Sequence, residues 1–344
     1  MSPLDWGLGH ATRCVPIIKS LIARNIEVIL AANGAAQDYL VSRFPELKIL
    51  NPPAYDITYS GGRAFFDILL QTPKILKNID KENRWLGSKT NTLKIDAVIS
   101  DNRYGMYGNI PSVIITHQTS PRGPALLQGK LRRMVSKHLA NFDHCWIPDD
   151  PDQSLSGELS NTEDLTIPYS HIGPISRLNP IKTTQLGTIL GLVSGPETQR
   201  TDFENNLRKF LKSTGQESVL ICGKPKSVAS SVDGLITTHS HLDDESLAKA
   251  MLKAEYIFCR SGYSTILDLA KLGLKANLIP TRGQPEQVYL AEHLTENSNW
   301  RTFKEISHIK LNDCIPSNRT QLDACQNDSL EQEIDAFVKS IHSS

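Results

Sequence analysis

Short apolar runs rich in β-branched residues alternate with segments of helical spacing along the whole chain. This alternation is typical of parallel α/β domains, in which each strand is followed by a helix that leads back to the next strand. In the first half we expect a helix at residues 11–23 and strands at 27–31, 97–100, 112–116 and 144–147. In the second half we expect helices at 201–211, 244–253 and 265–272, and strands at 187–193, 218–222, 256–259 and 276–279.

The length of 344 residues favours two domains, because single hydrophobic cores rarely grow beyond about 250–300 residues. Residues 172–180 contain one glycine and two prolines, which interrupt both periodicities. We therefore predict an N-terminal domain at 1–178 and a C-terminal domain at 179–344, with a last helix near 330–341 that packs back on the N-terminal domain. Only about five residues precede the turn at Gly7, so either the first strand is short or the chain lacks a few native N-terminal residues.

Composition excludes some classes of protein. The 37 basic residues balance 37 acidic ones, whereas nucleic-acid-binding proteins usually show a basic surplus, so no nucleic-acid partner is expected. None of the six cysteines lies in a C-x-x-C pair, which favours reduced, buried thiols in a cytoplasmic protein over zinc or disulfide sites. No apolar run approaches the length that spans a bilayer.

Two charged segments have competing interpretations. Residues 122–138 mix basic and apolar side chains, which suits a peripheral contact with the inner face of the membrane or a solvated helix face; the overall charge balance favours the second. Asp150-Pro-Asp152 matches a D-x-D motif that can hold a divalent metal ion. No further acidic or histidine ligand stands at a useful spacing, so no metal is expected there.

A glycine-rich turn, Asp5-Trp-Gly-Leu-Gly-His-Ala-Thr-Arg13, joins the first predicted strand to the first helix. Gly7 and Gly9 permit close backbone approach, and the free N–H groups at a helix start bind anions. The helix dipole disfavours imidazolium there, so we expect His10 to be neutral and able to accept a proton, with Arg13 beside it in the same cleft. An ordinary tight turn with a capping or core histidine is the alternative.

Two turns in the second half have the same character. Ser194 and Gly195 follow one predicted strand, and Arg260-Ser-Gly-Tyr-Ser-Thr-Ile-Leu-Asp268 follows another. Gly262 and the hydroxyl residues around it expose amides toward a diphosphate at the helix start, and the carboxylate about two turns further on can accept hydrogen bonds from ribose hydroxyls. In open parallel sheets ligands bind beyond the carboxyl ends of the strands, where all three turns lie.

The 260–268 turn, together with Gly273-Leu-Lys-Ala-Asn-Leu-Ile-Pro280 and Gly283-Gln-Pro-Glu-Gln287, resembles the donor-site motif of glycosyltransferase family 28. Three shorter stretches also resemble motifs of this family: Gly7-Leu-Gly-His10, Thr116-His117-Gln118 and Ser194-Gly195. The best-known member adds N-acetylglucosamine to a lipid-linked peptidoglycan precursor. The first loop departs from that member, because Asp-Trp precedes its glycines and the triple-glycine form is missing. It is more similar to uncharacterised family-28-related proteins of bacteria.

The resemblance implies a GT-B fold, in which two Rossmann-like parallel-sheet domains face each other across a cleft. It also implies an inverting, metal-independent glycosyltransferase that uses a nucleotide diphosphate-sugar and no cofactor. We expect a UDP-linked donor, with UDP-N-acetylglucosamine as the candidate sugar donor. The acceptor is an unidentified hydroxyl compound, and lipid-linked compounds of the cell envelope are among the candidates.

Residues that match the family motifs form the expected donor site. By this resemblance the ribose is held by Asp268, where the peptidoglycan enzyme has Glu, and the sugar hydroxyls by Glu286 and Gln287. The full expected donor set is Ser194, Gly195, Arg260, Ser261, Gly262, Ser264, Thr265, Asp268, Gln284, Glu286 and Gln287.

On the acceptor side, Asp101 and Arg103 follow a predicted strand at its carboxyl end and are expected to face the cleft. His10 is the first candidate for the catalytic base. Asp101 takes that role if His10 only positions phosphate, and a helix-capping Asp101 is equally compatible with the pattern. The remaining acceptor-side candidates are Gly7, Gly9, Arg13, His117 and Gln118.

Two other functions fit the same fold. A nucleotide-sugar hydrolase or epimerase would use the same donor site, and a non-catalytic nucleotide-sugar-binding protein would need no base at all.

Overall fold

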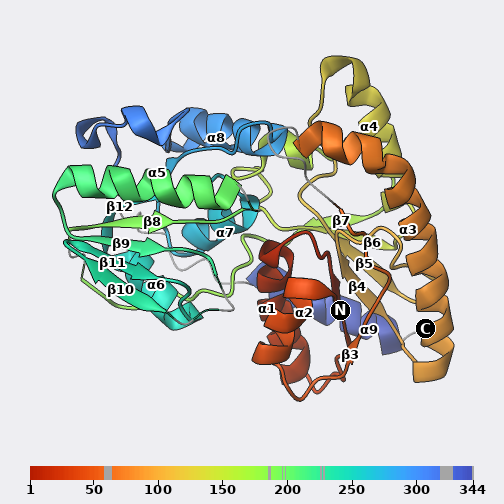
Figure 1. The fold of residues 1–344 in the computed structure, drawn as a ribbon. Coiled ribbons are helices and arrows are strands. Elements are labelled where there is room, and N and C mark those ends of the chain that lie inside the picture. Colours follow the sequence, from red (N-terminus) through yellow and green to blue (C-terminus); the bar gives the residue numbers. More distant parts are fainter. Residues whose placement is uncertain are drawn as a thin grey trace. The chain divides into compact units, whose positions relative to one another are not determined.

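The computed structural model describes residues 1–57, 64–184, 187–195, 197, 199–224, 227, 229–317 and 328–342. The chain divides into two compact units, Met1–Ile175 with Gln326–Ser344 and Ser176–Cys325. This division lies beside the boundary predicted at residue 178, and the C-terminal helix α9 (Asp328–His342) belongs to the first unit. Each unit contains an open sheet covered by helices (Figure 1).

The main sheet of the first unit is parallel and has the order β1-β4-β5-β6-β7. A short parallel pair, β2-β3, continues it, because Ala31 N–H donates to Met1 O at 2.9 Å and Met1 N donates to Ile29 O at 2.9 Å. The strand order therefore reverses between β1 and β4, which makes this position the topological switch point of the sheet. The strands are β1 (Ser2–Pro3), β2 (Leu30–Ala31), β3 (Ile49–Leu50), β4 (Val98–Asp101), β5 (Ser112–Ile115), β6 (His144–Ile147) and β7 (Tyr169–His171).

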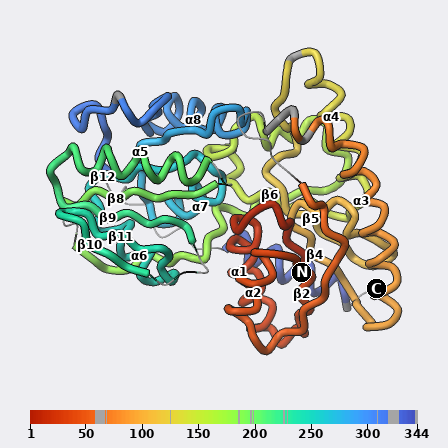
Figure 2. The backbone as a smooth tube through the Cα atoms, viewed as in Figure 1, coloured from red at the N-terminus to blue at the C-terminus, as the bar shows by residue number. Residues whose placement is uncertain are grey.

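The helices of the first unit are amphipathic and bury one stripe each. On α1 the buried stripe includes Cys14 and Ile18, and this helix packs beside α2 and α9 (Figure 2). Arg24, just after α1, forms ion pairs with Glu331 at 2.8 Å and Asp335 at 2.7 Å, which hold α9 in place. The helices other than α9 are α1 (Leu8–Ala23), α2 (Gly34–Arg43), α3 (Ala64–Leu93), α4 (Ala125–Leu139) and the short 3-10 helix η1 (Gly157–Ser160).

The sheet of the second unit has the order β10-β11-β9-β8-β12-β13-β14 and is parallel except for the β10–β11 hairpin. Its order reverses between β8 and β12. Helix α5 covers one face and α6 the other (Figure 1). The strands are β8 (Thr188–Leu192), β9 (Ser218–Ile221), β10 (Ser230–Asp233), β11 (Ile236–His239), β12 (Ala254–Cys259), β13 (Asn277–Leu278) and β14 (Arg301–Thr302). The helices are α5 (Gln199–Thr214), α6 (Asp244–Lys253), α7 (Tyr263–Lys271), α8 (Pro285–Ser298), η2 (Ile306–His308) and η3 (Leu311–Asp313).

Close packing in the second unit depends on a glycine in the central strand β8. A Cβ at Gly191 would lie 2.7 Å from Leu207 Cδ2, so α5 packs directly on the bare backbone. Phe258 of β12 is fully buried and meets Phe210 of α5 edge-to-face, with ring centroids 4.8 Å apart. These contacts fix α5 over the strands whose carboxyl ends carry the predicted donor residues.

The cysteines of the described residues are free thiols, as predicted. Cys14, Cys145, Cys222 and Cys259 are buried and Cys314 is partly buried, whereas Cys325 lies outside the described residues. None of the described helices is both long enough and apolar enough to cross a bilayer.

Candidate functional site

Three side chains of the first unit meet at the carboxyl ends of β1 and β4. His10 and Arg13 lie one turn apart at the start of α1, and Asp101 is the last residue of β4. His10 Nδ1 lies 2.7 Å from Asp101 Oδ1. Arg13 donates from Nε to Asp101 Oδ2 at 2.6 Å and from Nη2 to Asp101 Oδ1 at 2.5 Å. The cluster therefore occupies the switch point of the sheet, where open α/β sheets bind their ligands.

Asp101 is held in its ionised form. Its side chain is 0% exposed. Burial works against ionisation, but the charge of Arg13, the charge of His10 when it is protonated, and the hydrogen bonds from both outweigh it and hold the pKa of Asp101 well below its usual value. Both carboxylate oxygens are occupied, so Asp101 is poorly placed to take a proton from a ligand.

The contact with Asp101 also fixes the tautomer of His10. A carboxylate can only accept hydrogen bonds, so in the 2.7 Å contact with Asp101 Oδ1 it is Nδ1 that carries the proton. The longer approach of Arg13 Nη2 to Nδ1, at 3.0 Å, is then a contact between two donors and not a hydrogen bond. The proton on Nδ1 leaves the lone pair of Nε2 to accept a proton from a ligand. The His10 side chain is 20% exposed, whereas Arg13, at 4%, is turned inward onto Asp101. The prediction that Arg13 points into the ligand cleft is therefore wrong, because its guanidinium serves the carboxylate.

The turn before α1 leaves room for a ligand. Gly7 has φ 144°, a value that L side chains rarely adopt, and a Cβ there would meet none of the described atoms within 4 Å. Helix α1 begins without a side-chain cap, so its first N–H groups have no such partner. Gly9 lies in the first turn of the helix, and its carbonyl accepts from Thr12 Oγ1 at 3.0 Å.

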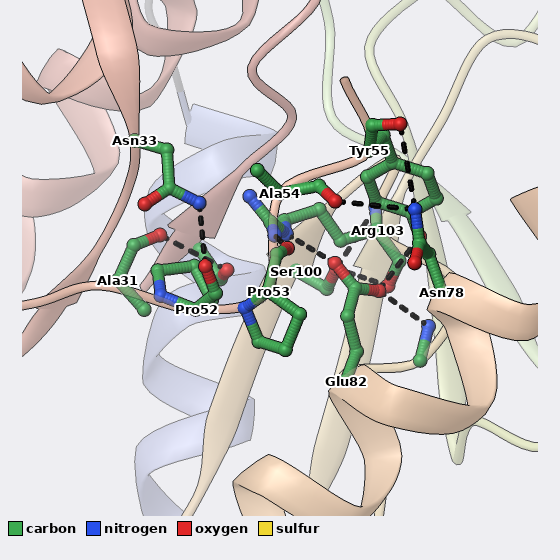
Figure 3. Close-up of polar contacts among 12 residues, drawn as sticks. Ala31, Asn33, Pro52, Pro53, Ala54, Tyr55, Asn78, Glu82, Ser100 and Arg103 are labelled. Atoms are coloured by element: carbon green, nitrogen blue, oxygen red, sulfur yellow. Dashed lines mark hydrogen bonds and ion pairs between the residues drawn. The ribbon is translucent and has the colours of Figure 1, made fainter. Parts of the chain in front are cut away.

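Arg103 does not face this space. It is 0% exposed, its Nε donates to Glu82 Oε1 at 2.7 Å, and its Nη2 donates to Pro53 O at 2.6 Å (Figure 3). Tyr55 donates its hydroxyl to the other oxygen of Glu82 at 2.6 Å. The predicted acceptor-side role of Arg103 is therefore wrong. Its donors bind Glu82 of α3 and a carbonyl of the loop after β3, so Arg103 joins the turn after β4 to both.

His117 and Gln118 follow β5 after one residue, Thr116, and so lie at the predicted edge of the sheet. His117 is 3% exposed. The N–H of Gln118 donates to Thr116 Oγ1 at 3.0 Å and closes the turn. Contact of either side chain with an acceptor stays a prediction.

In the second unit, glycines stand at the carboxyl ends of the strands on both sides of the switch point. Gly195, after β8 and Ser194, has φ 112°, and Gly262 caps the N-terminus of α7 after β12. A Cβ at either glycine would meet no described atom within 4 Å. No side chain caps α7, and Ser264 and Thr265 in its first turn are partly exposed. This arrangement suits an anion, because it combines open space with the N–H groups of a helix start.

Arg260 and Ser261 behave differently from one another. Arg260 Nη1 donates to the carbonyls of Ile279 and Pro280, both at 3.0 Å, and its guanidinium lies 4.0 Å from the ring centroid of Phe203. Burial lowers the pKa of Arg260 to about 10, so it remains charged at neutral pH. Ser261 is fully buried, and its hydroxyl donates to Gln287 O at 2.7 Å. The hydroxyl of Ser261 therefore joins the turn before α7 to α8, and the place of Ser261 beside the phosphates stays a prediction.

Asp268 lies on α7 beside the chain that enters the second unit. Its Oδ1 accepts from Ser176 Oγ at 2.5 Å. Burial raises the pKa of Asp268, and the positive charge of Arg177 opposes that rise. Arg177 itself is paired with Asp244 at the start of α6, with 2.9 Å between Arg177 Nε and Asp244 Oδ1. The sequence does not mark Ser176 as a partner, because 92 positions separate it from Asp268.

Side-chain amides of two glutamines stabilise the loop after β13. Gln287 Oε1 accepts from Thr281 N–H at 2.9 Å, and its Nε2 donates to Gln284 Oε1 at 2.7 Å. Glu286 lies in the first turn of α8 and is partly exposed. The structure therefore brings these residues to the same carboxyl edge as Gly195 and Gly262, with Gln287 already engaged in shaping the loop.

The structure also describes the two charged segments discussed in the sequence analysis, the D-x-D motif at Asp150–Asp152 and the basic segment at 122–138. In the D-x-D motif, Asp150 Oδ2 accepts from Ser154 Oγ at 3.3 Å. Nowhere in the described part of the chain do three or more His, Cys, Asp or Glu side chains gather into a metal-binding group. Helix α4 covers most of the basic segment; Arg132 pairs with Asp164 at 2.7 Å, Val135 is buried, and Leu126 at the helix start is 95% exposed.

No family model and no curated protein sequence matches the chain. Solved structures, however, match over its whole length. The glycotransferase of kitacinnamycin gives a TM-score of 0.63 at 13% identity, covering 100% of this chain and 94% of that one. SnogD, a glycosyltransferase from Streptomyces nogalater, gives 0.60 at 15% identity over 99% and 94%. MurG from Acinetobacter baumannii gives 0.53 at 16% identity over 99% and 97%. The chain therefore has the GT-B fold, as predicted, with two Rossmann-like parallel-sheet domains.

Proposed function

We propose that the protein is a glycosyltransferase that moves a sugar from a nucleotide diphosphate-sugar to an acceptor hydroxyl. The observation that carries this proposal is the His10–Asp101 pair at the switch point of the first unit. A neutral imidazole oriented by a buried carboxylate is suited to remove the proton of an attacking hydroxyl. The fold shared with glycosyltransferases supports the same assignment.

The donor is assigned to the second unit. Its diphosphate would lie at the N-terminus of α7 near Gly262, where helix N–H groups and open space coincide. Asp268 would accept hydrogen bonds from the ribose, and Glu286 with Gln287 would contact the sugar. The resemblance to family 28 over residues 260–287 favours UDP as the nucleotide, with N-acetylglucosamine as the candidate sugar.

The proposed reaction is a single displacement with inversion. The acceptor oxygen forms a bond to the anomeric carbon while the bond from that carbon to the β-phosphate oxygen breaks. The acceptor proton goes to His10 Nε2, and the nucleoside diphosphate leaves with the bonding electrons. The positive end of α7 and the charge of Arg260 would stabilise the leaving group, so the proposal needs no metal ion.

His10 rather than Asp101 is the base in this proposal. Asp101 is fully buried, and its oxygens are occupied by His10 and Arg13. It would act through His10 by fixing the tautomer and stabilising the imidazolium that forms.

The acceptor is assigned to the first unit, and a lipid-linked acceptor is one candidate. The 95% exposed Leu126 at the start of the basic helix α4 supports a peripheral membrane contact there. Sedimentation with vesicles that contain or lack anionic lipid tests this part separately, with Leu126→Asp as the variant that should lose the contact.

Two measurements test the core of the proposal. The first is a thermal-shift screen with nucleotides and EDTA, in which UDP should raise the melting temperature more than other nucleoside diphosphates, with or without the chelator. The second follows UDP-N-acetylglucosamine with and without membrane extract in the unchanged chain and in His10→Ala. Extract-dependent release of UDP, lost in the variant, supports transfer. Release of free sugar at the same rate without extract would indicate a hydrolase instead, and unchanged consumption in His10→Ala would refute the assigned base.

A further inference from the structure

Arg13 is hydrogen-bonded to Asp101 and lies against His10, the two members of the candidate catalytic pair. It stands one helical turn after His10 and is 4% exposed. Its Nε and Nη2 grip the two oxygens of Asp101 at 2.6 Å and 2.5 Å. The same Nη2 lies 3.0 Å from His10 Nδ1. When a guanidinium donates to a carboxylate through two nitrogens, the two charge-assisted hydrogen bonds fix the relative orientation of the groups. The positions of Arg13 and Asp101 relative to each other are therefore well defined.

A buried carboxylate beside an imidazole has two opposing effects on a base. It orients the ring, which assists catalysis, but it also favours the protonated imidazolium. An imidazole that is already protonated has no lone pair at Nε2 and cannot accept the acceptor proton. A catalytic histidine at this position therefore needs a carboxylate that orients its ring, but whose negative charge is partly balanced by a nearby cation.

Within the described part of the chain, no cation other than Arg13 and the imidazole of His10 itself contacts Asp101. Burial raises the pKa of the Cys14 thiol well above its usual value, so this group stays neutral. The guanidinium of Arg103 is paired with Glu82. Asp5 precedes the turn and would add negative charge, and His117 follows β5 at the same edge. Arg13 is thus the cation that is bonded directly to Asp101.

We propose that Arg13 is a positioning residue that balances the charge of Asp101, so that His10 is oriented by the carboxylate yet stays unprotonated at Nε2 at neutral pH. The assignment rests on the proposed function for its catalytic meaning. The charge balance itself is a property of the protein without substrate, and it can be measured in that state.

The test is NMR titration of the full chain labelled with ¹³C and ¹⁵N in histidine, with the His10 signals assigned by their loss in His10→Gln. At neutral pH the ¹⁵N shifts of the unchanged chain should report a protonated Nδ1 and an unprotonated Nε2. In Arg13→Gln the pH of half-protonation of His10 should lie above that of the unchanged chain, because a compensating charge next to its partner is lost. Arg13→Lys keeps the charge and should restore most of the difference.

A second variant keeps the test decisive if Arg13→Gln does not fold. In Asp101→Asn the guanidinium remains without the carboxylate, so half-protonation of His10 should move to lower pH. The proposal is overturned if neither variant moves the titration, or if Arg13→Lys shifts it as far as Arg13→Gln. If the titrations behave as expected but His10→Ala leaves sugar transfer intact, the charge balance stands and the proposed function fails.

Discussion

Replacing Arg103 by methionine would leave a charged carboxylate without its partner in the interior of the first unit. Arg103 and Glu82 both have fully buried side chains, with 2.7 Å between Arg103 Nε and Glu82 Oε1. Methionine fills much of the same volume but donates no hydrogen bond. After the change Glu82 keeps the hydroxyl of Tyr55 at 2.6 Å and the N–H of Gly105 at 3.2 Å as donors, and it loses its counter-charge.

Breaking a buried ion pair from one side costs about 3–5 kcal/mol of folding free energy, because the remaining charge is uncompensated. In a domain of about 150–250 residues each kcal/mol corresponds to about 2–4 °C. We therefore expect Arg103→Met to lower the melting temperature of the first unit by roughly 6–20 °C at about pH 8.

The loss should depend on pH in a defined direction. Burial already raises the pKa of Glu82, against the opposing charge of Arg103. Without Arg103 that pKa rises further, so the folded variant binds a proton more readily than the unfolded chain. Stability is then retained at low pH and lost as the pH rises through the folded-state pKa. The deficit of Arg103→Met relative to the unchanged chain should therefore be smaller at about pH 5 than at about pH 8.

The matched control is the double variant Glu82→Gln/Arg103→Met, which removes the stranded charge and keeps its shape. Differential scanning calorimetry of the three proteins at both pH values measures the effect. The double variant should melt above Arg103→Met at about pH 8. The reasoning is refuted if the double variant is no more stable than the single one, or if Arg103→Met melts within about 2 °C of the unchanged chain.

Three further predictions concern the second unit. Gly262→Ala should leave the melting temperature unchanged, because a Cβ there meets no described atom within 4 Å. It should weaken UDP binding about tenfold, because it places a methyl group in the proposed diphosphate space. Calorimetric titration compares it with the control Gly87→Ala, whose Cβ also meets no described atom within 4 Å, and equal UDP affinity of the two variants would contradict the prediction. Asp268→Asn should weaken UDP binding about tenfold or more, since hydrogen bonds to a charged group contribute about 1.5–3 kcal/mol, and equal affinity of variant and unchanged chain would argue against a ribose contact. Gly191→Ala should destabilise the second unit by about 1–3 kcal/mol, because its Cβ would lie 2.7 Å from Leu207 Cδ2; an unaltered calorimetric transition would show that α5 can move away.

Strongly periodic segments of the chain could be predicted from the sequence. The helix starting at Asp244 and the strand His144–Ile147 lie where the pattern puts them, because an apolar period of 3.6 or 2 follows from burial of one face. Other elements leave no such signal. Helix α3 (Ala64–Leu93) contains Pro73 and Gly87, which interrupt its apolar period, and the two-residue strand β3 is too short to show one. Of the strand predicted at 27–31, only Leu30–Ala31 forms a strand, β2.

For the candidate site, too, some features could be predicted from the sequence and others could not. The glycine turns and the polar residues at strand ends were visible in the sequence, since phosphate-binding turns need glycine and a following helix start. The roles of individual side chains were not. Arg13, Arg103 and Ser261 all stand beside the expected ligand positions, yet each gives its donors to a protein group. Their partners are 88, 21 and 26 positions away in the chain, so no local pattern could show them.

The sequence by itself determined the class of fold, the division into two units and the edge of each sheet at which the candidate site residues lie. These follow from periodicity and turn residues, which act over a few neighbouring positions. Only the tertiary structure decided that His10 meets Asp101 with its Nε2 left open, and that Arg13 compensates the carboxylate. The strand order brings β1 next to β4 across about a hundred residues, and hydrogen bonds over such separations depend on three-dimensional packing rather than on local pattern.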